Sequence, residues 1–195
     1  METTRDHVHE ATPTPFEFER WVGDARSGGS FGYTALYEWL SPEVKRFAVG
    51  RAARDADAVT NDAFLGAFNQ LASFEGDARA FRSWVFAIVR NRLIDQHRAE
   101  QRRPPIADHD GEAWAEPAAP SAEELTMAGL GSAGVAELLS SLTDAQQEVL
   151  ILRLVTGLSL EETADVVGRP VTAVKRLQAR ALDRLRRENP DGPVS

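Results

Sequence analysis

A chain of 195 residues can form one ordinary domain or two small ones. It has no cysteine and four scattered histidines, which excludes disulfides and disfavours metal sites, so no metal or other cofactor is expected. No apolar run approaches the roughly 20 residues of a membrane span, and the polar start Met1 to Glu10 lacks the apolar stretch of a secretory signal. The chain is therefore predicted to be a cytoplasmic protein without membrane insertion.

The formal net charge of -8 argues against a nucleic-acid partner, because Lys and Arg contacts to phosphate supply most non-specific affinity. The distribution of charge argues for one. Two basic clusters stand in an acidic chain: Arg79, Arg82, Arg90, Arg92, Arg98, Arg102 and Arg103, and then Arg169, Lys175, Arg176, Arg180, Arg184, Arg186 and Arg187. A single cluster is a solvated helix face about as often as it is a binding surface. Two clusters, each at the end of a helical module, favour nucleic-acid binding.

Residues 16–103 are predicted to form a compact helical bundle after a tail of residues 1–15. Apolar residues recur here at helical spacing, and no strand-like alternation stands out. Pro42 predicts a new helical turn after Ser41, because proline costs about 3 kcal/mol inside a helix, so the helices on either side of it are expected to be adjacent or kinked. The expected helices cover Tyr33 to Leu40, Pro42 to Ala53, Asp55 to Ala72 and Ala80 to Glu100, with a loop at Phe74 to Asp77.

The composition changes between residues 104 and 133, which carry four prolines, six acidic residues and no Lys or Arg. This segment is predicted to be a flexible linker that could reach about 100 Å when extended. Two modules could then engage distant sites on one partner. The pattern also allows a short helix at Ser121 to Ala128, with Ser121 and Glu124 forming a capping box.

Helical spacing returns in residues 134–189, which precede a tail of residues 190–195. Thr143 and Ser159 are placed as N-caps, and a glycine follows each of the first two helices. The expected helices are Thr143 to Gly157, Leu160 to Val167 and Pro170 to Arg187. This order is that of a helix-turn-helix. The chain is therefore predicted to be all-α, with two small helical domains joined by a flexible acidic linker.

The second helix of a helix-turn-helix enters the major groove, where side chains near its N-terminus reach base edges. The candidate readers are Arg169, Thr172, Ala173, Lys175 and Arg176. Arg180 lies further along, where it is better placed for phosphate or for water. A helical hairpin with solvated arginines is the alternative, although small Ala164 and the turn at Gly168 favour the DNA interpretation.

The first module places aromatic residues among arginines, around Phe74, Phe81, Trp84, Phe86, Arg79, Arg82, Arg90 and Arg92. This combination suits unstacked bases, each of which can contribute about 1 to 3 kcal/mol by stacking. Phe81, Trp84 and Ile88 also have the spacing of a buried helical stripe. Most of these aromatics must therefore be core, and only exposed members could contact DNA.

Several stretches of the sequence are similar to a known family. Asp57-Ala58-Val59-Thr60-Asn61-Asp62-Ala63-Phe64-Leu65 and Phe81 to Arg98 resemble region two of the extracytoplasmic-function (ECF) sigma factors of bacterial RNA polymerase. Leu142 to Leu150, Gly157 to Ala164 and Val174-Lys175 resemble their region four. These matches follow the order of the family and cover nearly all of the chain outside the N-terminal tail and the linker.

The resemblance implies a sigma factor that binds core RNA polymerase and directs it to promoters. The helix from Asp55 to Phe68 would dock on the clamp helices of the largest subunit, through Asp57, Asn61, Asp62 and Leu65. Region four would read the minus-thirty-five element. The minus-ten element would be recognised and melted, with capture of an unpaired base, by Phe74, Asp77, Arg79, Arg82, Arg90, Asn91, Asp95 and Arg98.

The resemblance also implies partners beyond the polymerase and promoter DNA. The family is commonly held inactive by an anti-sigma protein, so an anti-sigma factor is expected. The acidic linker would thread the RNA-exit path of the polymerase and mimic nucleic acid there, or would be a solvated spacer. Ala58, Gln147 and Pro170-Val171-Thr172-Ala173 depart from the usual pattern of the family, so the resemblance does not extend to a promoter sequence.

Two other classes of protein compete with the sigma-factor interpretation. A free-standing regulator would use only the C-terminal helix-turn-helix, and it would bind a promoter tightly without polymerase. An enzyme is disfavoured, because paired acids such as Glu161-Glu162 have no pocket, nucleophile or metal constellation around them in the pattern.

Overall fold

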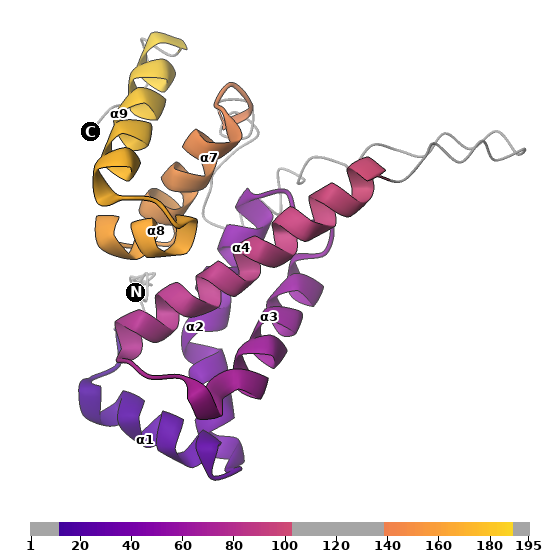
Figure 1. Ribbon diagram of the computed structural model, residues 1–195, viewed down its shortest axis with the longest axis vertical. Coiled ribbons are helices and arrows are strands. Elements are labelled where there is room, and N and C mark those ends of the chain that lie inside the picture. Colours follow the sequence, from indigo (N-terminus) through magenta and orange to yellow (C-terminus); the bar gives the residue numbers. More distant parts are fainter. Residues whose placement is uncertain (1–11, 103–138, 189–195) are drawn as a thin grey trace, which may run out of the picture.

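The computed structural model describes residues 12–102 and 139–188, and every regular element in these ranges is helical, as predicted. The linker expected at residues 104–133, with its short helix, lies outside the described residues. The first unit (Figure 1) contains α1 (Pro15–Arg26), α2 (Ser30–Gly50), α3 (Ala56–Gln70), the 3-10 turn η1 (Leu71–Ser73) and α4 (Ala78–Arg102). The second contains α7 (Asp144–Leu150), the π-helical turn η2 (Ile151–Val155), α8 (Leu160–Val167) and α9 (Val171–Glu188).

Helix α1 was not predicted, because the first expected helix began near Tyr33 and the N-cap Thr14 fell within the predicted tail. A capping box starts it: the Glu17 N–H donates to the Thr14 hydroxyl oxygen at 3.3 Å, and the Thr14 N–H donates to the Glu17 carboxylate at 2.9 Å. The Thr14 hydroxyl also donates to this carboxylate, and these hydrogen bonds lower the pKa of Glu17. Pro15 occupies the first helical position, where a backbone N–H would have no acceptor within the helix, so the lack of an N–H in proline costs nothing.

Helix α2 is continuous through Pro42, so of the two predicted alternatives the structure excludes separate adjacent helices. Pro42 and Glu38, whose carbonyl loses its helical partner, are both exposed, so water can satisfy the interrupted turn. The opposite side of the helix stays buried on both sides of the proline, at Leu36, Leu40, Val44 and Phe47. Burial of this continuous stripe offsets the local cost of the proline.

The first unit has an aromatic core where α1, α2 and α4 meet. The Phe81 ring lies 5.7 Å from the Phe18 ring and 6.3 Å from the Trp39 ring, measured between centroids. Gly32 allows α1 to cross α2 closely, because an added Cβ would collide with the Trp21 carbonyl oxygen. Helices α3 and α4, which were predicted within two residues of their observed bounds, complete this unit.

The second unit confirms the predicted helix-turn-helix. Capping boxes at Thr143 and Ser159 start α7 and α8, and both follow the predicted pattern. The helix after Thr143 widens into the π-helical turn η2 before it reaches Gly157. Gly168 ends α8 with a φ of 65°, which favours glycine, and the chain then enters α9.

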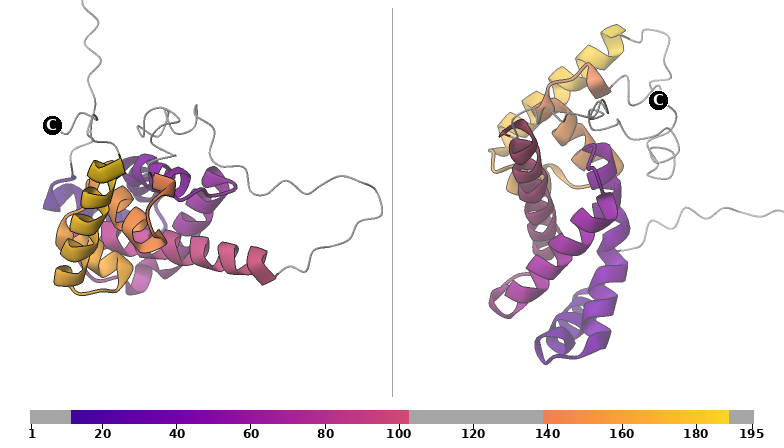
Figure 2. Two further views of the ribbon diagram at one scale, coloured as in Figure 1. Left: turned by 90° about the horizontal axis from the view of Figure 1, so that it is seen from above. Right: turned by 90° about the vertical axis from the view of Figure 1, so that its right-hand side faces the viewer.

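The two units pack against each other. Helix α8 lies on the N-terminal half of α4, between α4 and α9 (Figure 1), and η2 contacts α2. The buried apolar residues of both units form one continuous cluster. Figure 2 shows the same arrangement from two further directions, with the long α4 helix extending beyond the second unit. The predicted domains are thus in direct contact in this structure.

Candidate nucleic-acid interface

Helix α4 carries its candidate DNA-binding residues on two different faces. Successive residues of an α-helix are rotated by about 100°, so Arg79, Arg82 and Arg90 share one face, and Asn91, Asp95 and Arg98 share another roughly 140° away. The first face is turned toward the second unit, and the residues of the second face are exposed. The residues predicted to bind the minus-ten element therefore do not form one open surface here.

Arg82 lies at the centre of the contact between the two units, with its side chain only 14% exposed. Its Nε and Nη2 atoms donate to Glu43 Oε2 of α2 at 2.9 and 2.7 Å. Its Nη1 atom lies 3.5 Å from Glu162 Oε1 of α8, and Nη2 also donates to the Thr156 carbonyl. Because Glu162 also accepts the Ser159 N–H at the N-cap, one carboxylate joins the start of α8 to α4.

Arg90 and Arg79 extend this contact in both directions along α4. Arg90 Nε donates to Glu148 Oε1 of α7 at 2.9 Å, and the Glu148 side chain is 10% exposed. Arg79 Nη2 donates to the Ser159 hydroxyl oxygen at 2.6 Å and lies 3.6 Å from a Glu161 carboxylate oxygen. The paired acids Glu161 and Glu162 thus form ion pairs with Arg79 and Arg82 of α4.

A fourth arginine, Arg51 after α2, joins the units at Gln147. Its Nη1 atom donates to Gln147 Oε1 at 3.0 Å. A cationic side chain in place of Gln147 could not accept this hydrogen bond, because it has no acceptor atom. Sequence reasoning missed Glu43, Arg51 and Glu148 as parts of this contact, because no local spacing links residues so far apart in the chain.

The loop before α4 packs into the core in this arrangement. The Phe74 ring stacks on the Trp84 ring with centroids 5.1 Å apart and meets the Phe81 ring edge-on at 5.5 Å. Phe74 is 9% exposed. Asp77 caps α4 by accepting the Ala80 N–H at 2.8 Å. Capture of an unpaired base by Phe74 stays a prediction, and it would require the stacked pair to open.

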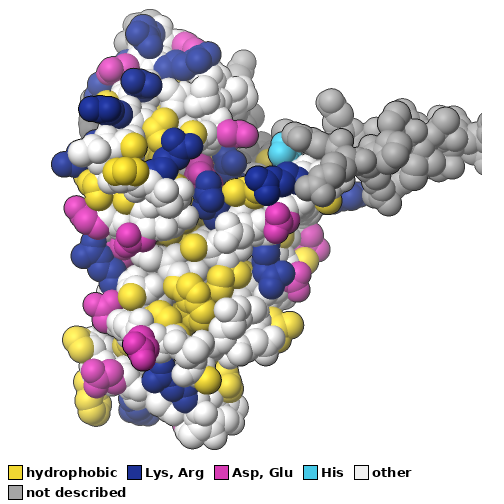
Figure 3. Space-filling view, in the orientation of Figure 1, with side chains coloured by type: hydrophobic (Ala, Val, Ile, Leu, Met, Phe, Trp, Pro, Cys, Tyr) yellow, Lys and Arg dark blue, Asp and Glu magenta, His cyan; other side chains and the backbone are white. Residues whose placement is uncertain are grey.

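Helix α9 presents the second basic cluster to solvent. Val174 and Ala181 bury its inner face, and Ala173 is half-buried. Lys and Arg side chains gather at the end of the molecule formed by α9 (Figure 3), and within the described residues no ion pair engages Arg169, Lys175, Arg176 or Arg180. Thr172 is exposed beside them. This surface has the placement expected of a recognition helix.

Arg153 of η2 connects the turn of the helix-turn-helix to α9. Its Nη1 atom donates to the Leu158 carbonyl, and its Nε atom donates to Gln178 Oε1 at 3.4 Å. These contacts help to fix the direction of the recognition helix relative to the preceding turn.

The predicted polymerase contacts share the outer face of α3. Lys45 Nζ pairs with Asp57 Oδ1 at 2.7 Å, and the Tyr37 hydroxyl donates to Asn61 Oδ1 at 2.8 Å. Asp62 and Leu65 are also exposed, and Leu65 is one of four large apolar residues that the described part of the chain leaves in water.

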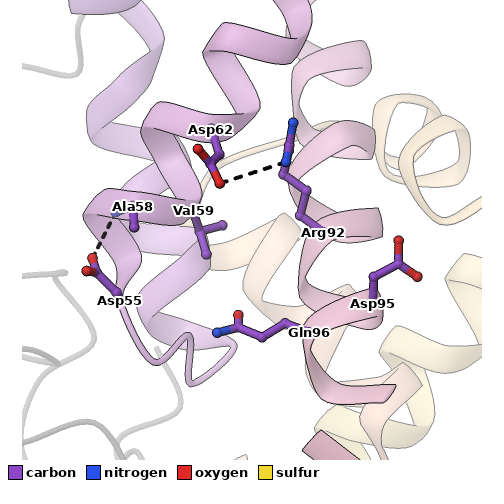
Figure 4. Close-up of a pocket in the computed structure, with 7 residues that line it drawn as sticks. All are labelled: Asp55, Ala58, Val59, Asp62, Arg92, Asp95 and Gln96. Carbon is purple, nitrogen blue, oxygen red and sulfur yellow. Dashed lines mark hydrogen bonds and ion pairs between the residues drawn. The ribbon is translucent and has the colours of Figure 1, made fainter. Parts of the chain in front are cut away.

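A groove of about 370 Å³ separates α3 from the C-terminal half of α4 (Figure 4). Asp62 Oδ2 lies 3.9 Å from Arg92 Nη1 across it. The other residues that line the groove are Asp55, Ala58, Val59, Asp95 and Gln96. The groove therefore joins the predicted polymerase surface on α3 to the exposed face of α4.

Within residues 12–102 and 139–188, no group of three or more His, Cys, Asp or Glu side chains could hold a metal ion. In the same part of the chain, no helix combines the length and the apolar character that crossing a bilayer requires.

Known proteins match both units. The family profile "Sigma-70 region 2" matches residues 35–103, and "Sigma-70, region 4" matches residues 138–187. The ECF RNA polymerase sigma factor SigD of Mycobacterium tuberculosis is 33% identical over 174 residues, which cover 86% of this chain and 81% of SigD. The chain belongs to the ECF sigma factors. It is therefore a transcription-initiation factor, as its sequence predicts.

Other comparisons agree with this family. This sigma factor is 32% identical to CnrH of Cupriavidus metallidurans over 151 residues. The matched stretch covers 71% of this chain and 78% of CnrH. The solved structure of CnrH in complex with the cytosolic domain of CnrY matches with a TM-score of 0.66 and 25% identity, over 90% of this chain and 99% of that one. These neighbours give no support to a free-standing regulator.

Proposed function

We propose that this ECF sigma factor acts in the cytoplasm, binds core RNA polymerase, and directs promoter recognition and melting without catalysing a reaction itself. The observation that carries this proposal is the presence, in one chain of this family, of two separate interaction surfaces. One is the exposed face of α3, and the other is the exposed basic face of α9. A regulator that acted without polymerase would have no use for the first.

Docking on the polymerase is assigned to Asp57, Asn61, Asp62 and Leu65. They lie on one side of α3 and are exposed, and Leu65 offers an apolar contact among polar ones. Hydrogen bonds and ion pairs from α2 and α4 hold three of these side chains in place. An ordered surface of this kind loses little conformational freedom on binding.

Promoter recognition is assigned to two helices. The exposed side of α4 at Asn91, Asp95 and Arg98, with the arginine row Arg79, Arg82 and Arg90 and the loop residues Phe74 and Asp77, would recognise the minus-ten element. Helix α9 would read the minus-thirty-five element with Arg169, Thr172, Ala173, Lys175 and Arg176, and Arg180 would hold phosphate. Each contact alone would be weak, and attachment to one polymerase would raise the effective concentration of the other.

An anti-sigma factor is the proposed regulator. CnrH, which shares this fold, was solved in complex with the cytosolic domain of CnrY. A partner of this class would inhibit this chain by covering α3 or the basic faces of α4 and α9.

Run-off transcription with core RNA polymerase on a library of promoter fragments tests the proposal. We expect specific starts that depend on this protein. Arg98→Ala should weaken promoters that depend on the minus-ten element, and Lys175→Ala should weaken those that depend on the minus-thirty-five element. Glu19→Gln, on the exposed side of α1, is the matched control and should leave the starts unchanged. No protein-dependent start, together with a duplex shifted by the protein alone, would contradict the proposal and favour a free-standing regulator.

A further inference from the structure

The second unit presents three carboxylates to the arginine row of α4. We name Glu148 of α7 with Glu161 and Glu162 of α8 the acidic face, and Arg79, Arg82 and Arg90 the arginine row. Each member of the row is within ion-pair distance of the acidic face: Arg90 to Glu148 at 2.9 Å, Arg82 to Glu162 at 3.5 Å, and Arg79 to Glu161 at 3.6 Å and to Glu162 at 3.8 Å.

The contacts made by the acidic face are those that DNA phosphates would make. A guanidinium group offers a planar set of N–H donors that fits carboxylate and phosphate oxygens alike. Arg90 Nε already donates to Glu148, and Arg82 is shared between Glu43 and Glu162. Helix α8 also packs against α4, and Glu148 of α7 covers Arg90, so a DNA strand could not reach the arginine row in this arrangement.

From these contacts we propose that the acidic face is an internal DNA mimic. In the free protein it binds the arginine row of α4 and competes with promoter DNA for it. This inference rests on the proposed function, because it concerns the same arginines as the minus-ten contact. The ligand of the acidic face is thus a segment of its own chain, and the competitor is the phosphate backbone of DNA.

Burial makes this internal ligand specific. Glu148 and Glu162 are both buried, and a buried carboxylate without a cationic partner is unfavourable. While the two units are in contact, these two carboxylates therefore need cationic partners, and Arg90 and Arg82 of α4 supply them. Helix α9 remains exposed at the same time. We call the arrangement in which the acidic face contacts the arginine row the closed arrangement. It would block the arginine row, and it would leave α9 free for duplex DNA and α3 free for the polymerase.

The closed arrangement can be followed in the full chain by fluorescence energy transfer. The sequence has no cysteine, so dyes attached to Asn69→Cys on α3 and Ala179→Cys on α9 report one defined distance. Glu148→Gln keeps the shape of the side chain and removes its charge. Asp165→Asn, on the exposed side of α8, removes one negative charge without touching the arginine row, and it is the matched control. We expect energy transfer to fall in Glu148→Gln and to stay unchanged in Asp165→Asn.

Competition with DNA is measured on the same variants, with a fluorescently labelled single-stranded oligonucleotide of mixed sequence as the probe. We expect Glu148→Gln to bind this probe about five-fold more tightly than Asp165→Asn does, the lower end of the usual range of coupling between two sites. If circular dichroism shows that Glu148→Gln does not fold, Glu161→Gln takes its place. The Glu161 carboxylate is exposed, so this substitution removes only the contact with Arg79. We again expect energy transfer to fall and the affinity for the oligonucleotide to rise.

Three results would overturn the proposal: unchanged energy transfer, reduced energy transfer without tighter DNA binding, or equal gains in affinity for the variant and the control. The last would show that net charge alone matters. Neither measurement uses polymerase. A chain that opens and gains DNA affinity as expected, but directs no run-off transcription, would therefore contradict the proposed function and not the competition.

Discussion

Helices α4 and α9 carry basic clusters that look alike in the sequence, and the structure uses them differently. The arginine row of α4 is paired with acids from other helices, and Arg82 is almost enclosed. The ion pairs of α9 join Arg184 to Glu188 and Arg186 to Asp183 along its own exposed surface. A basic cluster on a helix is therefore open to a partner only where no acidic side chains of another helix face it, and that is a property of the tertiary structure.

The difference also has an energetic side. Exposed ion pairs contribute about 0 to 1 kcal/mol, because water and salt screen them. Removal of one partner from a buried pair costs about 3 to 5 kcal/mol, because the other charge is left buried. Mutations in the arginine row of α4 should therefore affect stability and function together, whereas mutations of the exposed basic residues of α9 should affect function alone.

The largest effect is expected from Arg82→Ala. This change removes the cation that pairs with Glu43 and leaves Glu162 with Arg79 alone as its cationic partner, and we expect it to lower the free energy of unfolding by about 3 kcal/mol. Arg180→Ala, an exposed arginine of α9, should change it by less than about 0.5 kcal/mol. Urea unfolding followed by circular dichroism gives both values. Equal losses for the two variants would remove the energetic distinction between the clusters.

Lys175→Ala should reduce transcription without reducing stability. Lys175 is exposed near the N-terminal end of α9, so its loss should leave the free energy of unfolding unchanged. We expect run-off transcription from a responsive promoter to fall about tenfold, which corresponds to the loss of one good base or phosphate contact. Arg187→Ala, near the other end of α9, is the control and should reduce transcription less. If the two variants behave alike, α9 binds DNA by general charge and does not read a sequence near its N-terminus.

Local signals predicted most of the fold. The caps at Thr143 and Ser159 and the turn at Gly168 depend on residues three or four positions apart, and the structure has all three. The capping box at Thr14 is equally local, and it was missed because residues 1–15 were treated as a tail. Pro42 left two alternatives open, adjacent helices or one kinked helix, and the buried stripe on both sides of the proline decided for one continuous helix.

The candidate site was less predictable than the fold. Charge clusters correctly placed the basic residues on α4 and α9, and the exposed face of α3 holds the four predicted polymerase contacts. The acidic partners of Arg82 and Arg90 could not be found in this way. Glu43 and Glu148 are separated from these arginines by 39 and 58 positions, and no periodicity in the sequence encodes such a contact.

Gly168 forms the turn between α8 and α9. It therefore sets the direction of the exposed basic cluster of α9 relative to the arginine row of α4. Its φ of 65° is unfavourable for other residues, although an added Cβ would meet open space. We expect Gly168→Ala to cost about 1 kcal/mol through this backbone strain. Gly23→Ala, which adds a methyl group in open space inside α1, should stabilise the protein slightly. Thermal unfolding compares them, and a Gly168→Ala variant as stable as the wild type would show that the turn tolerates a side chain.

The smallest effect is expected at α1, which supports the N-terminal end of α4 through the contact between Phe18 and Phe81. Thr14→Ala removes the capping box and should cost about 0.5 to 1 kcal/mol at neutral pH. The cap includes the ionised Glu17 carboxylate, whose pKa is lowered in the folded protein. A lowered pKa means that this contribution is present above the ordinary pKa of glutamate and is lost as the pH falls through the folded value. The difference between wild type and Thr14→Ala should therefore shrink in acid, and a difference that stayed constant with pH in urea unfolding would place the effect in the Thr14 hydroxyl alone.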